Sequence, residues 1–540
     1  MGRVRAAVAK ANQKVPIQLA ALLLAGSTLL SALLGILRER FLNRAYYDTY
    51  PTGIDAYTVA FTLPDFMFII LVSGALSVTF IPVFNQRLAK GNKRSAWELS
   101  TSLINFMALI TLTASILIII FAEPIVQYIV APGLDEASRA LAVSMMRVIA
   151  VNPFLFAIAT VIASMQQAIG RFTFFALAPT IYNVGIIIGT LFFTQGISIG
   201  SWQIFEGGIM GVALGVVLGS IMQLLVSTIG LFGLGFDYRF KIYWKNKGFR
   251  KVLSLLPARS LDQGMDYVVS IAETNLASRM ASGTIRAYNQ ALTLHLMPIN
   301  LIGVAISTAA FPSLTERLGE GRVDLFTKEL RGTIRVITWI ILPIAAIAFF
   351  ARGYVVNFIK EGGDPLMANL LGALVVAILF RSIYHIAARS FYAQQDTKTP
   401  LYVSIFAIAL NIVLAIWFTT VLDWGPYGLA WAQSIVAMVE VIILFVIMSR
   451  QLPDLFNIQF THAIGRMFAA TGLMAVISYI LVQIFQLQEV DQKFLETFPK
   501  FVVITIVSLS AYVWFSRLLQ LTEANPVIKR VKAMLFGRAR

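Results

Sequence analysis

A polar face runs along an otherwise apolar stretch, Val252 to Met280. Its members are Arg259, Asp262, Asp266, Ser270 and Glu273. Because successive members are three or four positions apart, they share one side of a helix with about 3.6 residues per turn. A charge at the centre of a bilayer costs about 2.5 to 3.5 kcal/mol on insertion scales, so such a face avoids lipid. The spacing therefore predicts a membrane helix that lines a watery cavity.

The residue types on this face indicate two kinds of chemistry. A guanidinium donates parallel hydrogen bonds to a diphosphate and stays charged, so Arg259 is a candidate contact for an anionic head group, with Asp262 and Asp266 in the same binding site. The alternative is that Arg259 anchors the helix at the interface or pairs with Asp262. Asp262, Asp266 and Glu273 are also candidate carriers of H+ or Na+, unless they only balance Arg259 and Arg279.

Composition indicates the class of element that positions these side chains. Of 540 residues, 58% are hydrophobic and 13% are charged, which is typical of a polytopic helical membrane protein. There is no cysteine, and the histidines are far apart in sequence, so we expect no metal centre. The net charge of +16 does not indicate nucleic-acid binding, because Lys and Arg concentrate in alternate connections, as membrane topology requires.

Hydropathy over windows of about 20 residues predicts fourteen membrane helices. We place them at 16–37, 57–84, 99–122, 141–167, 174–194, 208–234, 252–280, 286–314, 333–350, 365–392, 400–420, 426–449, 464–485 and 499–517. Basic connections such as 87–94, 239–251 and 317–331 follow every second helix. Both termini are therefore expected in the cytoplasm, and the basic segments at the two ends are candidates to lie on the inner leaflet.

An internal repeat divides the chain into two halves. Segment 73–91 matches 303–321, pairing Pro82 with Pro312, and two further matches in the same order are Asn183 with Asn411 and Gly208 with Gly425. The repeat unit spans six helices, so the two copies are expected to form lobes related by a pseudo-two-fold axis along the membrane normal. The predicted divisions are 1–237 and 238–453, with 454–540 holding two extra helices and a basic tail. Asn411 joins the carboxylates as a candidate for ion coupling.

Two six-helix lobes with a charged helix at the start of the second are typical of a secondary transporter working by alternating access. A channel would need a repeated filter segment, which we do not find. A non-transporting scaffold has no need for charges at bilayer depth. No Walker-type phosphate loop occurs in the connections, so we expect no ATP site.

Residues 389–400, R-S-F-Y-A-Q-Q-D-T-K-T-P, resemble a signature segment of the MurJ-type lipid II flippases, in the multidrug/oligosaccharidyl-lipid/polysaccharide exporter superfamily. Shorter matches are Leu34-Gly35 with Arg38, Asp55-Ala56-Tyr57, Gly74-Ala75, and Gly303-Val304-Ala305 with Pro312. The resemblance implies two lobes around a central cavity and a lipid-tail groove formed by the last two helices.

This resemblance also implies the activity. A lipid-linked peptidoglycan precursor would cross from the inner to the outer leaflet of the cytoplasmic membrane, with no bond made or broken and no bound cofactor. Membrane potential, H+ and Na+ remain open as driving forces. The implied partners are the anionic lipid-linked glycan, membrane lipids and, as a candidate, the cell-wall synthesis machinery; nucleic acid is not expected.

Several positions depart from the family pattern. The family's arginines on helices 1, 2 and 8 are ascribed the role of holding the substrate diphosphate. Here helix 1 has Ala32, helix 2 has Phe68-Ile69 and Ser73 in place of its arginine and glutamate, and helix 8 has about Thr293. The head-group identity therefore stays open, with another polyprenyl-diphosphate glycan or a cation-coupled drug antiport as alternatives.

Two further groups of residues are singled out. Arg38, Glu39 and Asp55 lie at the predicted outer ends of helices 1 and 2 and are candidates for an outer gate, with Arg38 also a head-group contact; the alternative is an interfacial run that ends the helix. Thr399 before Pro400 is expected to cap helix 11. Intramembrane Arg147, Arg381, His295 and His385 are candidates that we expect to be packing residues.

Overall fold

The computed structural model describes residues 17–72, 75–199, 202–452, 454–487, 493–526 and 528–529. It forms two compact units, Met1–Ile285 and Arg286–Arg540. The first contains α2 (Ile17–Tyr46), α3 (Pro51–Leu71), α4 (Ala75–Ala89), α5 (Lys93–Ile125), η1 (Val126–Val130), α6 (Glu136–Ile149), α7 (Asn152–Ile169), α8 (Thr173–Phe192), η2 (Phe193–Gln195), β1 (Ile197–Ile199), β2 (Trp202–Phe205), α9 (Met210–Ile229) and α10 (Lys247–Ala277).

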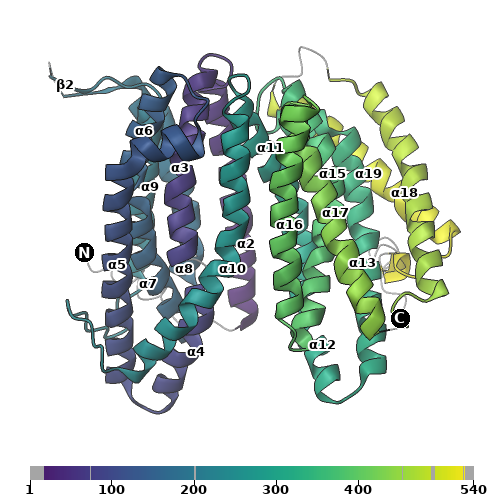
Figure 1. Ribbon diagram of the computed structural model, residues 1–540, viewed down its shortest axis with the longest axis horizontal. Helices are drawn as coiled ribbons and strands as arrows, with labels where there is room; N and C mark the ends of the chain where they lie inside the picture. The colour runs from purple at the N-terminus through teal and green to yellow at the C-terminus, as the bar shows by residue number, and fades with distance from the viewer. Residues whose placement is uncertain are drawn as a thin grey trace. The chain divides into compact units, whose positions relative to one another are not determined.

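The second unit continues the helical pattern (Figure 1). Its elements are α11 (Thr284–Pro298, which begins at the boundary), η3 (Ile299–Val304), α12 (Ala305–Gly319), α13 (Val323–Phe350), α14 (Arg352–Asn357), α15 (Pro365–Ala393), α16 (Lys398–Ile416), η4 (Trp417–Val421), α17 (Pro426–Gln451), α18 (Ile458–Ile484) and α19 (Phe494–Leu518). The antiparallel pair β1–β2 is a small two-stranded sheet in the connection between α8 and α9.

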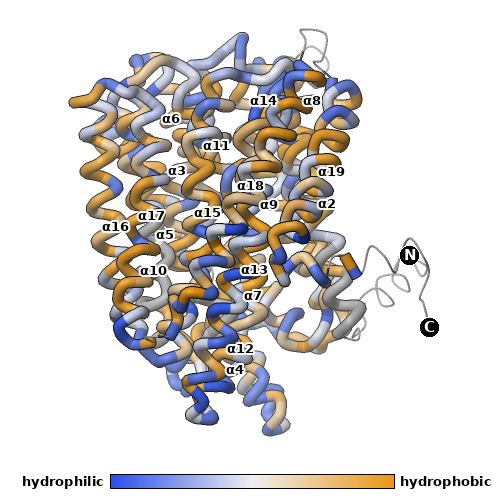
Figure 2. Tube along the Cα trace, turned by 90° about the vertical axis from the view of Figure 1, so that its right-hand side faces the viewer, coloured by the Kyte–Doolittle hydropathy of each residue, from blue (hydrophilic) through white to orange (hydrophobic). Residues whose placement is uncertain are grey.

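The polytopic helical class is confirmed. Among the described residues, twelve helical segments are long and apolar enough to cross a membrane. The two remaining predicted spans coincide with α2 and α10, while the count of fourteen stays a prediction. Apolar residues dominate along the helices, and hydrophilic residues gather at the end of α4 and at the end of α12 (Figure 2).

Four predicted spans are interrupted. One of them, 400–420, changes to π-helical turns in η4 at Trp417. The span 57–84 divides into α3 and α4, and the span 141–167 divides into α6 and α7, where Pro153 lies in the first turn of the second helix. The span 286–314 changes to π-helical turns in η3 directly after Pro298. Proline removes a backbone donor and crowds the preceding turn, which accounts for the last two changes.

Close helix packing gives the first unit its frame. α8 lies against both α9 and α2. The contact with α9 is lined by glycines, and a Cβ added to Gly189 would lie 2.3 Å from the Cα of Gly215, while one added to Gly185 would lie 2.2 Å from the Cα of Gly219. Small residues let membrane helices approach closely, so these positions hold α8 in register with α9. The core beside this frame buries Phe80 completely.

The second unit has a core of its own. Phe326 and Phe391 are fully buried in it. α18 and α19 pack against each other, and α18 packs against α13. The Trp339 indole of α13 donates a hydrogen bond of 3.1 Å to the Ser516 hydroxyl of α19. Polar contacts of this kind satisfy side chains that have no access to water in a bilayer.

Candidate functional site in the first unit and in the α15 to α17 bundle

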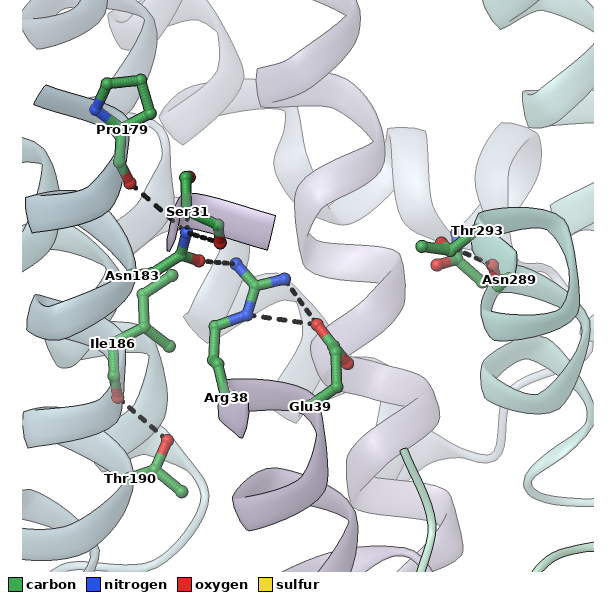
Figure 3. Close-up of polar contacts among 9 residues, drawn as sticks. All are labelled: Ser31, Arg38, Glu39, Pro179, Asn183, Ile186, Thr190, Asn289 and Thr293. Carbon is green, nitrogen blue, oxygen red and sulfur yellow. Dashed lines mark hydrogen bonds and ion pairs between the residues drawn. The ribbon is translucent and has the colours of Figure 1, made fainter. Parts of the chain in front are cut away.

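Arg38 on α2 is held by three side-chain contacts in the first unit. Its Nη2 lies 2.5 Å from Glu39 Oε1, and its Nε donates to the same oxygen at 3.1 Å. Its Nη1 donates to Asn183 Oδ1 on α8 at 3.1 Å (Figure 3). A guanidinium bonded on three sides is fixed in direction, so Arg38 is a preorganised cation beside α8.

Asn183 in turn is fixed by α2. Its Nδ2 donates to both the backbone oxygen and the hydroxyl of Ser31 at 3.2 Å, and the side chain is 7% exposed. Thr180, one turn earlier on α8, donates to the backbone oxygen of Ser27 at 3.4 Å. The glycines fix α8 against α9, and Asn183 on α8 in turn positions Arg38.

The helix predicted around residues 252–280 is confirmed as α10. It packs against α3 and α4, with the Tyr267 ring 6.4 Å from the Phe66 ring. α10 therefore belongs to the first compact unit, although the repeat pairs it with helix 1 and predicts that it opens the second lobe. The predicted boundary between the two lobes, at residues 237 and 238, comes from the internal repeat of the sequence and stays a prediction.

The polar face of α10 is described in part. The side chains of Arg259, Asp262 and Asp266 lie outside the described residues, so their roles stay predictions. Glu273 is described, and only 2% of it is exposed. Among the described residues, no group of three or more His, Asp or Glu side chains is arranged to hold a metal ion.

Asp55 ties the start of α3 to the turn after α10. Its Oδ2 accepts a hydrogen bond of 2.6 Å from the backbone N–H of Gly283, and the side chain is 3% exposed. Gly283 has φ of +86°, a conformation that favours glycine. The same end of α10 is joined to η1, because Asn275 Nδ2 donates to the backbone oxygen of Ile129 at 2.6 Å. Arg38 and Glu39 thus form an ion pair, while Asp55 bonds to Gly283, and the role of the three residues in an outer gate stays a prediction.

The signature segment 389–400 forms the end of α15, a tight turn and the start of α16. Asp396 Oδ1 accepts from the backbone N–H groups of Lys398 and Thr399 at 3.0 Å, and Oδ2 accepts from the Thr399 hydroxyl at 2.6 Å. The prediction that Thr399 caps helix 11 is therefore wrong. Asp396 supplies the cap, since its side chain reaches the free donors of the first turn.

A family model described as "Lipid II flippase MurJ" matches residues 51–500. The chain belongs to the MurJ lipid II flippase family. The family predicted from the signature segment is thus confirmed.

Relatives extend over most of the chain. The "Probable lipid II flippase MurJ" of Thermotoga maritima is 24% identical over 510 residues, covering 93% of this chain and 97% of the relative. That of Borreliella burgdorferi is 23% identical over 442 residues, covering 80% and 84%. The "Lipid II flippase MurJ" of Burkholderia cenocepacia is 25% identical over 442 residues, covering 79% and 82%.

Solved structures share the fold. A lipid II flippase MurJ in an inward closed conformation has a TM-score of 0.74 at 22% identity, covering 92% of this chain and 98% of that one. An inward-facing multidrug transporter of the MATE family has a TM-score of 0.66 at 16% identity, covering 79% and 95%. An outward-facing MATE structure has a TM-score of 0.55 at 17% identity, covering 81% and 96%.

Against the MurJ pattern, the positions that lack arginine are filled by uncharged contacts. The Phe68 ring packs 5.4 Å from the ring of Phe156 on α7. The Thr293 hydroxyl donates to the backbone oxygen of Asn289, one turn earlier on α11, at 3.0 Å (Figure 3). Neither side chain has a charge to offer an anionic head group.

Asn411, the repeat partner of Asn183, has a different environment. It lies on α16, is 2% exposed, and neither side-chain atom has a hydrogen-bond partner among the described residues. A buried amide without partners is unfavourable, which makes this position a candidate for a ligand or a transient contact.

Two carboxylates were missed in the sequence. Asp65 on α3 interacts electrostatically with Arg38. Glu440 on α17 pairs with Arg381 on α15, with Nη1 and Oε2 separated by 3.2 Å. Both stand alone in long apolar runs, and an isolated carboxylate at bilayer depth is the signal that finds them.

Proposed function

We propose that this protein flips lipid II from the inner to the outer leaflet of the cytoplasmic membrane by alternating access. The observation that carries the proposal is the match to the family model over residues 51–500, on a chain with many membrane-spanning helices. The head group crosses while the lipid tail stays in the bilayer. The work is transport, with no bond made or broken.

Arg38 and Arg259 contact the anionic head group, with Asp262 and Asp266 in the same site. A diphosphate that reaches Arg38 replaces Glu39 as its partner, because Glu39 accepts two of the three guanidinium bonds. An Arg–phosphate pair is strengthened by charge and by parallel hydrogen bonds, which makes the exchange favourable. Asn183 keeps the guanidinium in place during the exchange.

Asp55 acts in the outer gate with Arg38 and Glu39. Its bond to the Gly283 backbone holds the turn after α10 against α3, and this supports a closed outer side. Opening requires that bond to break. Solved relatives of the fold include inward-facing and outward-facing transporters, which fits a cycle of this kind.

The driving force is H+, Na+ or membrane potential. Asp262, Asp266 and Glu273 are carriers through their carboxylates, and Asn411 offers an amide oxygen of the type that hard cations prefer. Both termini face the cytoplasm in this proposal, and the cell-wall synthesis machinery receives the flipped lipid.

Complementation of cells depleted of their lipid II flippase tests the substrate. Growth should be restored by the wild-type chain and lost in the double variant Arg38→Ala with Arg259→Ala at equal membrane levels. In vesicles, the double variant should flip labelled lipid II at least tenfold more slowly. A rate equal to the wild type would remove both arginines from the site.

A second candidate substrate is another polyprenyl-diphosphate glycan. Phe68 and Thr293 favour it, since they replace family arginines with uncharged contacts. Flipping of such a lipid in vesicles, without flipping of lipid II, would move the assignment to it.

A further inference from the structure

The second unit contains an ion pair near the midpoints of two helices. Arg381 Nη1 on α15 lies 3.2 Å from Glu440 Oε2 on α17. The two helices pack side by side (Figure 1). The Glu440 side chain is 2% exposed, whereas the Arg381 side chain is 27% exposed. The carboxylate is thus enclosed, while part of the guanidinium remains accessible.

Hydroxyl groups complete the surroundings of Glu440. Ser404 on α16 donates to Glu440 Oε1 at 3.0 Å, and the Tyr384 hydroxyl on α15 lies 3.0 Å from the same Ser404 hydroxyl. Both carboxylate oxygens are therefore hydrogen-bonded. The Glu440 carboxylate therefore links α15, α16 and α17. The hydroxyls of Ser404 and Tyr384 form a short hydrogen-bonded chain that starts at this carboxylate.

Arg381 begins a basic stripe on α15. Arg381, His385 and Arg389 are spaced by four residues on one helical face and are each partly exposed. Arg389 Nη2 donates to the Thr308 hydroxyl on α12 at 2.8 Å. Because cations in membrane segments avoid lipid, this stripe faces water or a polar ligand, and it extends from the helix midpoint toward the predicted cytoplasmic end.

We propose that Arg381 binds the anionic head group of the transported lipid, and that Glu440 takes up one proton when Arg381 leaves it. The inference rests on the proposed function. Phe68 and Thr293 replace arginines of the family, and Arg381 supplies a guanidinium at bilayer depth in this chain. Arg381 is the binding residue, and Glu440 is a positioning residue that holds it until the ligand arrives.

Charge balance requires the proton. The resting pair has no net charge, and an anionic group bound to Arg381 leaves the buried Glu440 carboxylate without its guanidinium. An uncompensated charge in an apolar interior is strongly unfavourable, so one proton from the aqueous phase neutralises it. The Ser404 and Tyr384 hydroxyls offer a path, because a hydroxyl both donates and accepts.

Among the described residues, three other titratable groups interact with the pair. Tyr384 interacts electrostatically with Glu440 and Arg381, and His385 on α15 and His295 on α11 interact with Arg381. Besides α15 and α16, only η4 among the described elements packs extensively on α17, and its residues, WFTTV, do not titrate. Within the described part of the chain, Glu440 is therefore the acidic group of this cluster.

Binding of two purified lipids to the full-length protein, measured as a function of pH, tests the proposal. The lipids are lipid II and undecaprenyl diphosphate, which share the diphosphate. Uptake of one proton predicts that affinity falls by up to tenfold for each unit of pH increase above the pKa that Glu440 has in the protein without bound lipid. An indicator dye in weak buffer should report one proton taken up for each lipid bound.

Variants separate the two roles. Glu440→Gln should bind without pH dependence and without proton uptake, and Arg381→Gln should bind at least tenfold more weakly. The double variant removes both charges together, so it keeps the interior neutral if a single variant folds poorly. It should bind weakly, with neither pH dependence nor proton uptake. Glu136→Gln, at an exposed glutamate of α6, is the matched control and should retain the wild-type slope.

A wild-type pH slope in Glu440→Gln, or wild-type affinity in Arg381→Gln, overturns the proposal. Binding of undecaprenyl diphosphate with the expected slope, without binding of lipid II, supports the ion-pair mechanism and removes the proposed substrate. Binding of lipid II without proton uptake supports the proposed substrate and overturns the ion-pair mechanism. Binding of neither lipid overturns both.

Discussion

The carboxylate of Asp55 accepts the backbone N–H of Gly283 at 2.6 Å, which joins the first turn of α3 to the turn that follows α10. A hydrogen bond to a charged group contributes about 1.5 to 3 kcal/mol. Asp55→Ala should therefore favour opening of the proposed outer gate by about tenfold to hundredfold. The chain has no cysteine, so Ala32→Cys provides one thiol whose labelling by a membrane-impermeant reagent reports the opening.

Asp55→Asn is the informative companion. It keeps an acceptor oxygen but loses the charge, so labelling should fall between the wild type and Asp55→Ala. Labelling that is unchanged in Asp55→Ala would mean that this bond does not hold the outer side closed.

The contact of α8 with α9 should not tolerate a methyl group. Gly189→Ala places a Cβ 2.3 Å from the Cα of Gly215, and overpacking of this kind costs about 1 to 3 kcal/mol. Gly472→Ala on α18 has no heavy atom within 4 Å of the new Cβ and should be neutral or stabilising. Thermal unfolding of the two purified variants makes the comparison. Equal midpoints would contradict the close approach of α8 and α9.

The two repeat-related asparagines should respond differently to alanine. Asn183→Ala removes one of the two acceptors of Arg38 and should lower stability by about 1.5 to 3 kcal/mol. Asn411→Ala removes an amide that has no partner among the described residues, so it should be neutral or stabilising. Thermal unfolding measured in sodium and in potassium salts tests both points. If Asn411 helps to bind Na+, sodium should raise the midpoint of the wild type and not that of Asn411→Ala.

The cap of α16 should weaken in acid. Hydrogen bonds from the Thr399 hydroxyl and the neighbouring backbone amides lower the pKa of Asp396 below its usual range. A lowered pKa in the folded state stabilises the protein above the unfolded pKa of about 3.9, and this contribution is lost as pH falls through the folded pKa. At neutral pH, Asp396→Ala should cost about 0.5 to 2 kcal/mol.

Unfolding of Asp396→Ala and wild type by denaturant, at neutral pH and near the acid limit of folding, measures this difference. The gap between them should narrow in acid. A gap that is constant with pH would show that the carboxylate charge does not contribute to the cap. Asp454→Ala, in an exposed turn, serves as the control.

Local patterns in the sequence were sufficient for the class of fold and for α10. The polar residues between Val252 and Met280 interrupt an apolar run at helical spacing, so the sequence predicts this helix without any knowledge of its contacts with other helices. The signature segment identified the family because its residues are contiguous. Its cap was misassigned, since Thr399 and Asp396 are both good capping residues and only the backbone path decides which one reaches the free N–H groups.

Contacts between helices were beyond the sequence. Glu440 stands out as a lone charge, but nothing in the chain states that it meets Arg381, because the pairing depends on how α15 packs on α17. Asn183 and Asn411 look equivalent in the repeat. Only the structure reveals that one amide is fully bonded to α2, while the other has no bond among the described residues.

The glycines between α8 and α9 have a mechanical consequence. Two helices whose backbones touch cannot slide past each other without opening a gap, so α8 and α9 should travel as one rigid lever, carrying Asn183 and the guanidinium attached to it. Bending is then left to places where the helical ladder is already altered, such as the π-helical turns after Pro298. The rigid pair of α8 and α9, which holds Arg38 through Asn183, is thus distinct from η3, where a helix can bend.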